Sequence, residues 1–232
     1  MKISSIHTWD MSPVEAIKLQ NRLRDMVSAE DGPDEIQYVA GLDVSIKENR
    51  GIGAAVILDY PDLQPVETAI AKKDIAFPYV PGLLSFREAP VLIAALKKLS
   101  LTPDLVLVDG QGIAHPRRLG IAAHLGVLTG LPTIGCGKTR LYGKYEGPGP
   151  RRGDYSWLYA GSEIIGAVVR TKERTNPIFI SVGNNISLDR AIRYILLCTT
   201  TYRLPEPIRI AHLTAGKESP GGSDWHANAL ML

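Results

Sequence analysis

The sequence is poor in cysteine and has no long apolar run. Its 232 residues include only Cys136 and Cys198, which do not form a C-x-x-C pair, so neither a cysteine zinc site nor a disulfide framework is expected. No apolar run approaches the roughly 20 residues that span a bilayer. The N-terminus also lacks the charged and apolar regions of a signal peptide. We therefore expect a soluble cytoplasmic protein with no membrane partner.

The charge is nearly balanced, with 26 basic and 24 acidic residues and a net charge of +2. Charge alone therefore does not identify a nucleic-acid-binding protein. Basic residues nevertheless gather locally, and local fields determine the affinity for phosphate. The clusters are Arg117 with Arg118, then Lys138, Arg140 and Lys144, then Arg151 with Arg152. For any single pair, solvated surface charge is the preferred explanation.

Apolar periodicity and turn residues divide the chain into helices and strands. Ser12 starts a capping box with Pro13 at the first helical position, which predicts a helix that ends near residue 28. Three strand-like stretches with short polar connections follow, as is typical of antiparallel neighbours. Two buried-type strands then alternate with two helices, which predicts parallel pairing through helical crossovers. The predicted ranges are strands 38–45, 51–59, 65–75, 104–109 and 132–135, helices 86–99 and 118–128, a hairpin at 157–159 and 164–171, a strand at 178–182, and a helix after Ser187.

This order of elements predicts one mixed α/β sheet, in which three antiparallel strands precede parallel strands and helices flank the faces. It resembles the ribonuclease H-like fold, which carries carboxylates on its first strand, its first long helix and its fourth strand. Asp43, Glu88 and Asp109 occupy those places, although a fold by itself does not determine a function. With no internal repeat and no linker, residues 1–217 are expected to form a single domain and residues 218–232 a flexible tail.

Two aspartates lie at the ends of apolar strands. Asp43 interrupts the run 39–44, and Asp109 ends the run 105–108. A carboxylate at the edge of a buried strand is costly unless it is paired, and Mg²⁺ prefers one or two carboxylates together with water and a phosphate oxygen. Either aspartate alone is more simply explained as a turn or cap residue. Two of them side by side would form a metal site.

Glu88 has two competing interpretations. Ser85 and Glu88 have the spacing of a capping box, in which Glu88 closes the N-terminus of the helix that follows. The other interpretation places Glu88 in the first turn of that helix, facing the two aspartates. One side chain cannot serve both roles fully.

Five longer strings point to a known family. They are GLDVS (41–45), PYVPGLLSFRE (78–88), VDGQGIAHPRRLG (108–120), IGCGKTRLYG (134–143) and YRLPEPIRIAH (202–212). Together they resemble endonuclease V, the deoxyinosine-directed DNA repair endonuclease, and the resemblance covers about residues 12–217. Several long strings in the same order make chance a poor explanation.

The resemblance implies an activity and the residues that carry it. Such an enzyme cleaves DNA at the second phosphodiester bond 3′ to deoxyinosine and uses Mg²⁺ or Mn²⁺. Asp43 and Asp109 match the family's metal-binding aspartates, and Glu88 matches its third acidic residue. Lys138 matches the active-site lysine, and His212 matches a histidine close to the metal. A surface lysine and a satisfied histidine are the ordinary alternatives for the last two.

The segment Pro78-Tyr79-Val80-Pro81 matches the wedge with which the family separates strands. The two prolines stiffen the backbone around Tyr79, so the ring can enter the base stack at a low cost in entropy. Inosine pairs less well than the base it replaces, which makes it easier to evert. The alternative for Tyr79 is an ordinary packed tyrosine.

A pocket for the everted base is expected beside this wedge. Backbone groups near Gly82, Leu84 and Gly110 are the candidates to read hypoxanthine, because glycine lets the backbone approach closely. His115 precedes Pro116 and is expected to be a supporting residue in a turn.

Three positions depart from motifs that the chain otherwise resembles. The string around Lys138 is close to a phosphate-binding loop, but that motif needs glycine where this chain has Pro132. The endonuclease V family usually has histidine where this chain has Gln111, and often where it has Asn184. Glutamine can donate and accept hydrogen bonds but does not titrate near neutrality, so Gln111 is not suited to proton transfer.

Two rival functions stay open on the sequence alone. One is the same chemistry on inosine in RNA, because contacts to a 2′-hydroxyl leave no signature in a sequence. The other is the non-catalytic binding of distorted duplexes, against which the intact Asp43, Glu88, Asp109 and Lys138 argue. The expected partner is DNA that contains deoxyinosine, and the expected state is a monomer.

Overall fold

The computed structural model describes residues 3–218 of the chain. The helices are α1 (Pro13–Leu23), the short 3-10 helix η1 (Arg24–Met26), α2 (Leu84–Leu96), α3 (Ile121–Thr129), α4 (Leu188–Leu197) and α5 (Glu206–Lys217). The strands are β1 (Tyr38–Lys47), β2 (Arg50–Asp59), β3 (Pro65–Asp74), β4 (Leu105–Asp109), β5 (Thr133–Gly137), β6 (Tyr155–Ala160), β7 (Glu163–Val169) and β8 (Ile178–Asn184). The tail expected at 218–232 lies outside the described residues, apart from Glu218.

The strands form one eight-stranded sheet in the order β3-β2-β1-β4-β5-β8-β7-β6. The pairs β1–β2 and β2–β3 are antiparallel, whereas β4 pairs in parallel with both β1 and β5. The remaining strands return antiparallel, with β8 against β5 and the predicted hairpin β6–β7 at the far edge. This confirms the expected mixed α/β class with three antiparallel strands followed by parallel strands.

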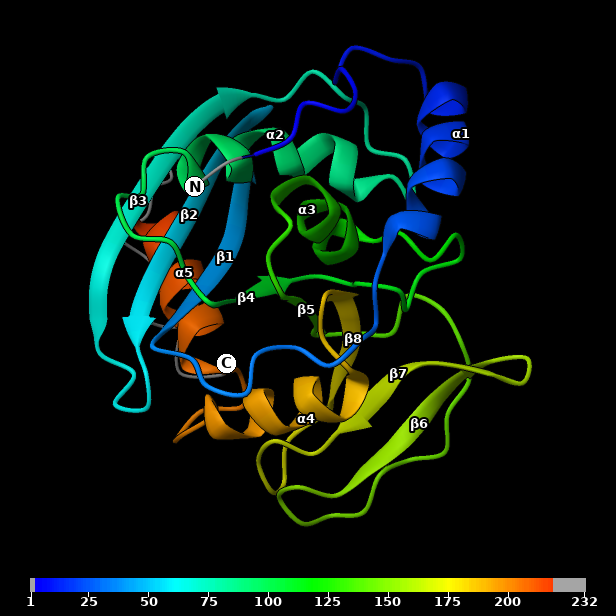
Figure 1. Cartoon of the computed structure of the whole chain (residues 1–232), viewed down its shortest axis with the longest axis vertical. Coiled ribbons are helices and arrows are strands. Elements are labelled where there is room, and N and C mark those ends of the chain that lie inside the picture. The colour runs from blue at the N-terminus through cyan, green and yellow to red at the C-terminus, as the bar shows by residue number, and fades with distance from the viewer. Residues whose placement is uncertain (1–2, 219–232) are drawn as a thin grey trace.

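Helices cover both faces of the sheet, as Figure 1 shows. On one face, α2 and α3 pack against β1 residues Ala40 and Leu42. On the other face, α4 and α5 pack against Val39 and Leu107. α1 lies outside α2 and α3, where its apolar residues join Phe86 in a smaller core. Because neighbouring residues of β1 point to opposite faces, both halves of the core meet on this strand.

Gly41 allows α5 to lie directly against β1. A Cβ atom at this position would stand 1.9 Å from the carbonyl oxygen of Pro207, so any side chain would push the helix away. Asp43 is two residues further along β1, and His212 is five residues beyond Pro207 along α5. Both steps cover about 7 Å. The close approach at Gly41 therefore brings His212 next to Asp43.

Several predicted boundaries were wrong, and one helix was not predicted. α1 keeps the capping box between Ser12 and Glu15 but ends at Leu23, where η1 tightens the last turn. α2 begins at Leu84 rather than Phe86, and α3 begins at Ile121 rather than Arg118. α5 was missed because its buried face uses small residues, among them Ala211 and Ala215, which give a weak apolar periodicity.

Cys136 and Cys198 are both buried and unpaired, in agreement with the expected absence of a disulfide. Within residues 3–218, no helix is both long enough and apolar enough to cross a membrane.

Candidate active site

A cavity of about 490 Å³ lies at the edge of the sheet beside Asp43 of β1 and the ends of β4 and β5. It gathers residues that are far apart in the sequence. Among the predicted site residues, Pro78 is outside the lining, and the others line it: Asp43, Tyr79, Val80, Pro81, Gly82, Leu84, Glu88, Asp109, Gly110, His115, Lys138 and His212.

Strand geometry points three of these side chains to the same face. Residues two apart on a strand share a face, and Asp109 continues the row of Leu107 while Lys138 continues that of Cys136. Leu107 and Cys136 belong to the core that α4 and α5 cover. Asp43 shares this face with Gly41, against which α5 packs. The two aspartates and the lysine therefore point to the face that α4 and α5 cover.

An ion pair and a hydrogen bond connect these residues. The Lys138 Nζ atom lies 2.7 Å from Asp109 Oδ2. The His212 Nδ1 atom lies 2.7 Å from Asp43 Oδ2, so its N–H donates to the carboxylate. A carboxylate that accepts from one ring nitrogen also sets the orientation of the imidazole. Each aspartate thus has its own partner and a fixed position.

The donor set fits a divalent cation. Asp43, Asp109 and His212 each offer a ligand atom, and these atoms all lie within 4.8 Å of one another. Carboxylate oxygens suit Mg²⁺ and Mn²⁺, and imidazole also binds transition metals. Glu88 stands outside this closest group, whereas His212 lies inside it.

The capping interpretation of Glu88 is wrong. α2 begins one residue before the predicted N-cap, Ser85, and its actual N-cap, Leu83, makes no side-chain cap bond. Ser85 instead hydrogen-bonds the ring of His124, with 3.2 Å between Ser85 Oγ and Nδ1. Glu88 is therefore left in the first turns of α2 with its side chain in the cavity.

The carboxylates of the site disfavour one another's charge. Burial raises the pKa of Glu88 to about 8, and the charges of Asp43 and Asp109 add to the rise. Burial and the charge of Asp43 raise the pKa of Asp109 to about 6, although Lys138 opposes the rise. A cation bound among these groups would relieve the repulsion, since an opposite charge favours the ionised form.

The carbonyl group of Gly82 holds the turn that follows Tyr79 in place. The Gly82 oxygen accepts hydrogen bonds from Gln20 Nε2 at 3.0 Å, His115 Nε2 at 2.9 Å and Arg117 Nη2 at 2.7 Å. Gly82 has φ +77, a conformation that side chains with a Cβ rarely adopt. Three donors, one from α1 and two from the segment 115–117, therefore fix the backbone at the mouth of the expected base pocket.

His115 is a neutral donor in this arrangement. Its Nε2–H donates to Gly82, and its Nδ1 accepts from the backbone N–H of Arg117 at 3.1 Å. Burial, followed by the charge of Arg117, lowers the pKa of His115 to about 4. The ring thus keeps one tautomer near neutral pH and supports the turn rather than transferring a proton.

Tyr79 projects from this turn into solvent. Its side chain is 73% exposed, so it is not the packed tyrosine of the alternative interpretation. The neighbouring Val80 is partly buried against the small core that contains Leu83 and Phe86. One residue thus anchors the segment while the adjacent aromatic ring remains accessible.

Gln111 and Asn184 both support the main chain. The Nε2 atom of Gln111 donates to the Thr139 carbonyl at 3.0 Å, which ties down the segment that carries Lys138. Asn184 accepts from the backbone N–H of Ser28 at 2.9 Å and donates to Gly126 at 3.2 Å. Neither contact requires a titrating group, and the buried Oε1 atom of Gln111 has no hydrogen-bond partner among the residues that the structure describes.

Two supporting residues were missed by sequence reasoning. Gln20 is 1% exposed and lies on the buried stripe of α1 with Ala16 and Leu23. A polar residue on the apolar face of a predicted helix can be recognised in the sequence, and it indicates a supporting role because a buried amide needs hydrogen-bond partners. Arg117 stands in the sequence as a member of a basic cluster, and its contact with Gly82, to which its Nη2 donates, has no signal there.

Known proteins resemble this chain along most of its length. The sequence model of the family described as Endonuclease V matches residues 21–213. A protein named Endonuclease V from Dehalococcoides mccartyi is 49% identical over 219 residues, which cover 94% of this chain and 98% of that protein.

Solved structures of similar proteins extend the comparison. The crystal structure of endonuclease V from Streptomyces avermitilis has a TM-score of 0.86 and 41% identity, and the match covers 93% of this chain and 96% of that one. Endonuclease V from Ciona intestinalis, crystallised with a 24mer DNA containing an inosine followed by a ribo-adenosine, has a TM-score of 0.76 and 29% identity. That match covers 88% of this chain and 96% of the Ciona chain.

Proposed function

The chain belongs to the endonuclease V family of nucleases, and we propose that it nicks DNA at the second phosphodiester bond 3′ to deoxyinosine in a reaction that depends on Mg²⁺. The observation that carries the proposal is the convergence of Asp43, Asp109 and His212 at one edge of the sheet, beside an exposed aromatic ring. The Ciona relative with inosine-containing DNA supports the choice of substrate.

The contacts within the site suggest how the residues divide the work. Asp43 and Asp109, with His212 beside them, would hold the cation, which supplies polarisation and charge neutralisation at the scissile phosphate. Lys138 keeps a compact positive charge 2.7 Å from Asp109, where it can hold a phosphate oxygen. Glu88 can hold or release a proton near neutral pH, because its pKa is raised to about 8.

The function is tested with matched oligonucleotides that carry either deoxyinosine or deoxyguanosine at one position. We expect the full chain with Mg²⁺, or with Mn²⁺ in its place, to nick only the deoxyinosine strand, and sequencing gels give the position of the cut. A matched strand with inosine in RNA separates the ribonuclease alternative. Binding without a nick in either metal would contradict the proposal and favour the non-catalytic alternative.

Tyr79 is proposed to act as the wedge that stabilises the opened base stack. We expect Tyr79→Ala to slow nicking of a deoxyinosine duplex by roughly tenfold, since stacking of a base on an aromatic ring contributes about 1–3 kcal/mol. The Tyr79→Phe variant keeps the ring and serves as the control, with a rate close to that of the wild type. Equal rates for the alanine and phenylalanine variants would rule out the wedge.

A further inference from the structure

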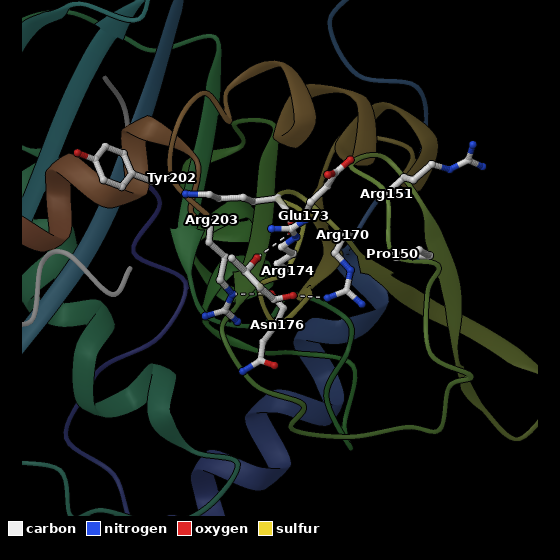
Figure 2. A pocket seen from close by; sticks show the side chains of 10 residues that line it. Pro150, Arg151, Arg170, Glu173, Arg174, Asn176, Tyr202 and Arg203 are labelled. Atoms are coloured by element: carbon white, nitrogen blue, oxygen red, sulfur yellow. Dashed lines mark hydrogen bonds between the residues drawn. The ribbon is translucent and has the colours of Figure 1, made fainter.

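A second and larger cavity lies beside the loop between β7 and β8. Its volume is about 940 Å³, and five of its lining residues are cations while one is acidic. Figure 2 shows Arg170, Arg174 and Arg203 in its central part, with Tyr202 toward one end and Arg151 toward the other. The lining consists of Pro150, Arg151, Arg170, Lys172, Glu173, Arg174, Thr175, Asn176, Tyr202 and Arg203. We call this cavity the basic pocket.

The basic pocket continues the line of the active-site residues along one edge of the sheet. β8 runs antiparallel to β5, with Gly137 opposite Phe179, so β8 begins where β5 ends. β7 in turn ends there, with Val169 opposite Ile178. From β1 across to β7, the edge therefore presents Asp43, Asp109 and Lys138, and then the loop of the basic pocket.

Arg203 joins the basic pocket to the active-site lysine. Its Nη2 donates to the carbonyl of Lys138 at 2.8 Å and to that of Pro177 at 3.0 Å. Its Nε donates to the carbonyl of Asn176 at 2.7 Å. One guanidinium group therefore holds the pocket loop against the backbone of Lys138. Arg203 lines the basic pocket and Lys138 lines the active-site cavity, so this contact connects the two cavities.

Lys172 and Arg174 carry charge that other residues leave uncompensated. Both are exposed, and no carboxylate within residues 3–218 lies within ion-pair distance of either side chain. By contrast, Arg118 of the basic cluster noted in the sequence pairs with Glu163 at 2.7 Å. Within the described part of the chain, Lys172 and Arg174 therefore present unpaired positive charge on a loop that lies outside the basic clusters of the sequence.

We propose that the basic pocket binds backbone phosphates of the same polynucleotide whose scissile phosphate lies at Asp43 and Asp109. The inference rests on the proposed function for its substrate class. Arginine and lysine side chains without carboxylate partners suit phosphate oxygens. A single strand that lies along the edge of the sheet can reach both sites, since Arg203 in the lining of one cavity donates to the carbonyl of Lys138 in the lining of the other. Such contacts position the strand but do not read its sequence.

The test compares DNA binding by the full chain and by the Lys172→Ala/Arg174→Ala double variant in metal-free buffer, where no cutting interferes. We expect the double variant to bind roughly tenfold more weakly at about 0.1 M salt, with a slope of log K against log salt that is shallower by up to about 2. The same loss is expected on a deoxyinosine duplex and on a plain duplex.

The matched control is Lys97→Ala/Lys98→Ala, which removes two exposed charges at the far end of α2. It should keep the wild-type affinity and slope, as should the charge-conserving variant Lys172→Arg/Arg174→Lys. A double alanine variant that behaves like the wild type overturns the inference, and so does a loss confined to the deoxyinosine duplex. Nicking by the wild type is measured in parallel with Mg²⁺. Binding without nicking contradicts the proposed function, whereas the salt slopes still show whether the basic pocket binds phosphates.

Discussion

Replacing Asp43 by asparagine is expected to lower the nicking rate on a deoxyinosine strand by roughly 10³-fold, the scale seen when one charge-stabilising group of an active site is removed. The amide has nearly the shape of the carboxylate, so the close packing of β1 under α5 is preserved. It lacks the negative charge that a divalent cation needs, and it accepts only a neutral hydrogen bond from His212. Single-turnover nicking at saturating Mg²⁺ measures the effect.

The control for this prediction is Asp62→Asn, a substitution of the same chemistry at an exposed position before β3. It should nick at the wild-type rate. A titration with Mn²⁺ should show weaker metal binding by Asp43→Asn and unchanged binding by the control. Undiminished nicking by Asp43→Asn would exclude Asp43 from the reaction and would remove the basis of the proposed metal site.

Without metal, the protein is expected to lose stability as the pH rises from about 5 to about 8, with Glu88 as the main cause. The pKa of Glu88 rises from 4.5 to about 8 in the folded protein, and that of Asp109 from 3.8 to about 6. A raised carboxyl pKa means that the folded state holds its proton when the unfolded state has lost it. The stabilisation is complete below the unfolded values and disappears as the pH passes the folded ones.

The measurement is urea unfolding of the wild type and of Glu88→Gln in a metal chelator. The free energy of unfolding of the wild type should fall relative to that of Glu88→Gln by on the order of 3 kcal/mol across this pH range. Added Mg²⁺ or Mn²⁺ should reverse the trend, because a cation and protons compete for the same carboxylates. Glu35→Gln, at an exposed position, is the matched control and should follow the wild type. Parallel pH curves for the wild type and Glu88→Gln would contradict the raised pKa.

Much of the fold and of the candidate site could be predicted from the sequence. The apolar run that Asp109 ends announces a buried strand, and the strand–helix alternation around it implies parallel pairing. Since parallel neighbours end at the same edge of a sheet, Asp43 and Asp109 could be expected to meet. Local patterns of this kind predict the folded structure well, because the alternation of side chains between the two faces is set by the backbone of the strand itself.

The rest depended on contacts that no local pattern carries. α5 has a weak periodicity because its close approach to Gly41 favours small residues, and His212 was expected near the metal only through family resemblance. Whether a basic residue pairs with a carboxylate also depends on contacts between residues that are far apart in the sequence. Arg118 is neutralised by Glu163, 45 residues away. Lys172 and Arg174 belong to none of the basic clusters of the sequence, and within residues 3–218 neither has a carboxylate partner.

The candidate active site needs a residue from α5, a helix that is synthesised late. Asp43 is made early in synthesis, and its partner His212 follows 169 residues later. A chain that ends before α5 keeps both aspartates and Lys138, yet it lacks the histidine and leaves apolar residues such as Val39 and Leu107 without their cover. An unfinished nuclease is therefore incomplete at its cutting site and marked by exposed apolar surface, the feature by which chaperones and proteases recognise immature proteins.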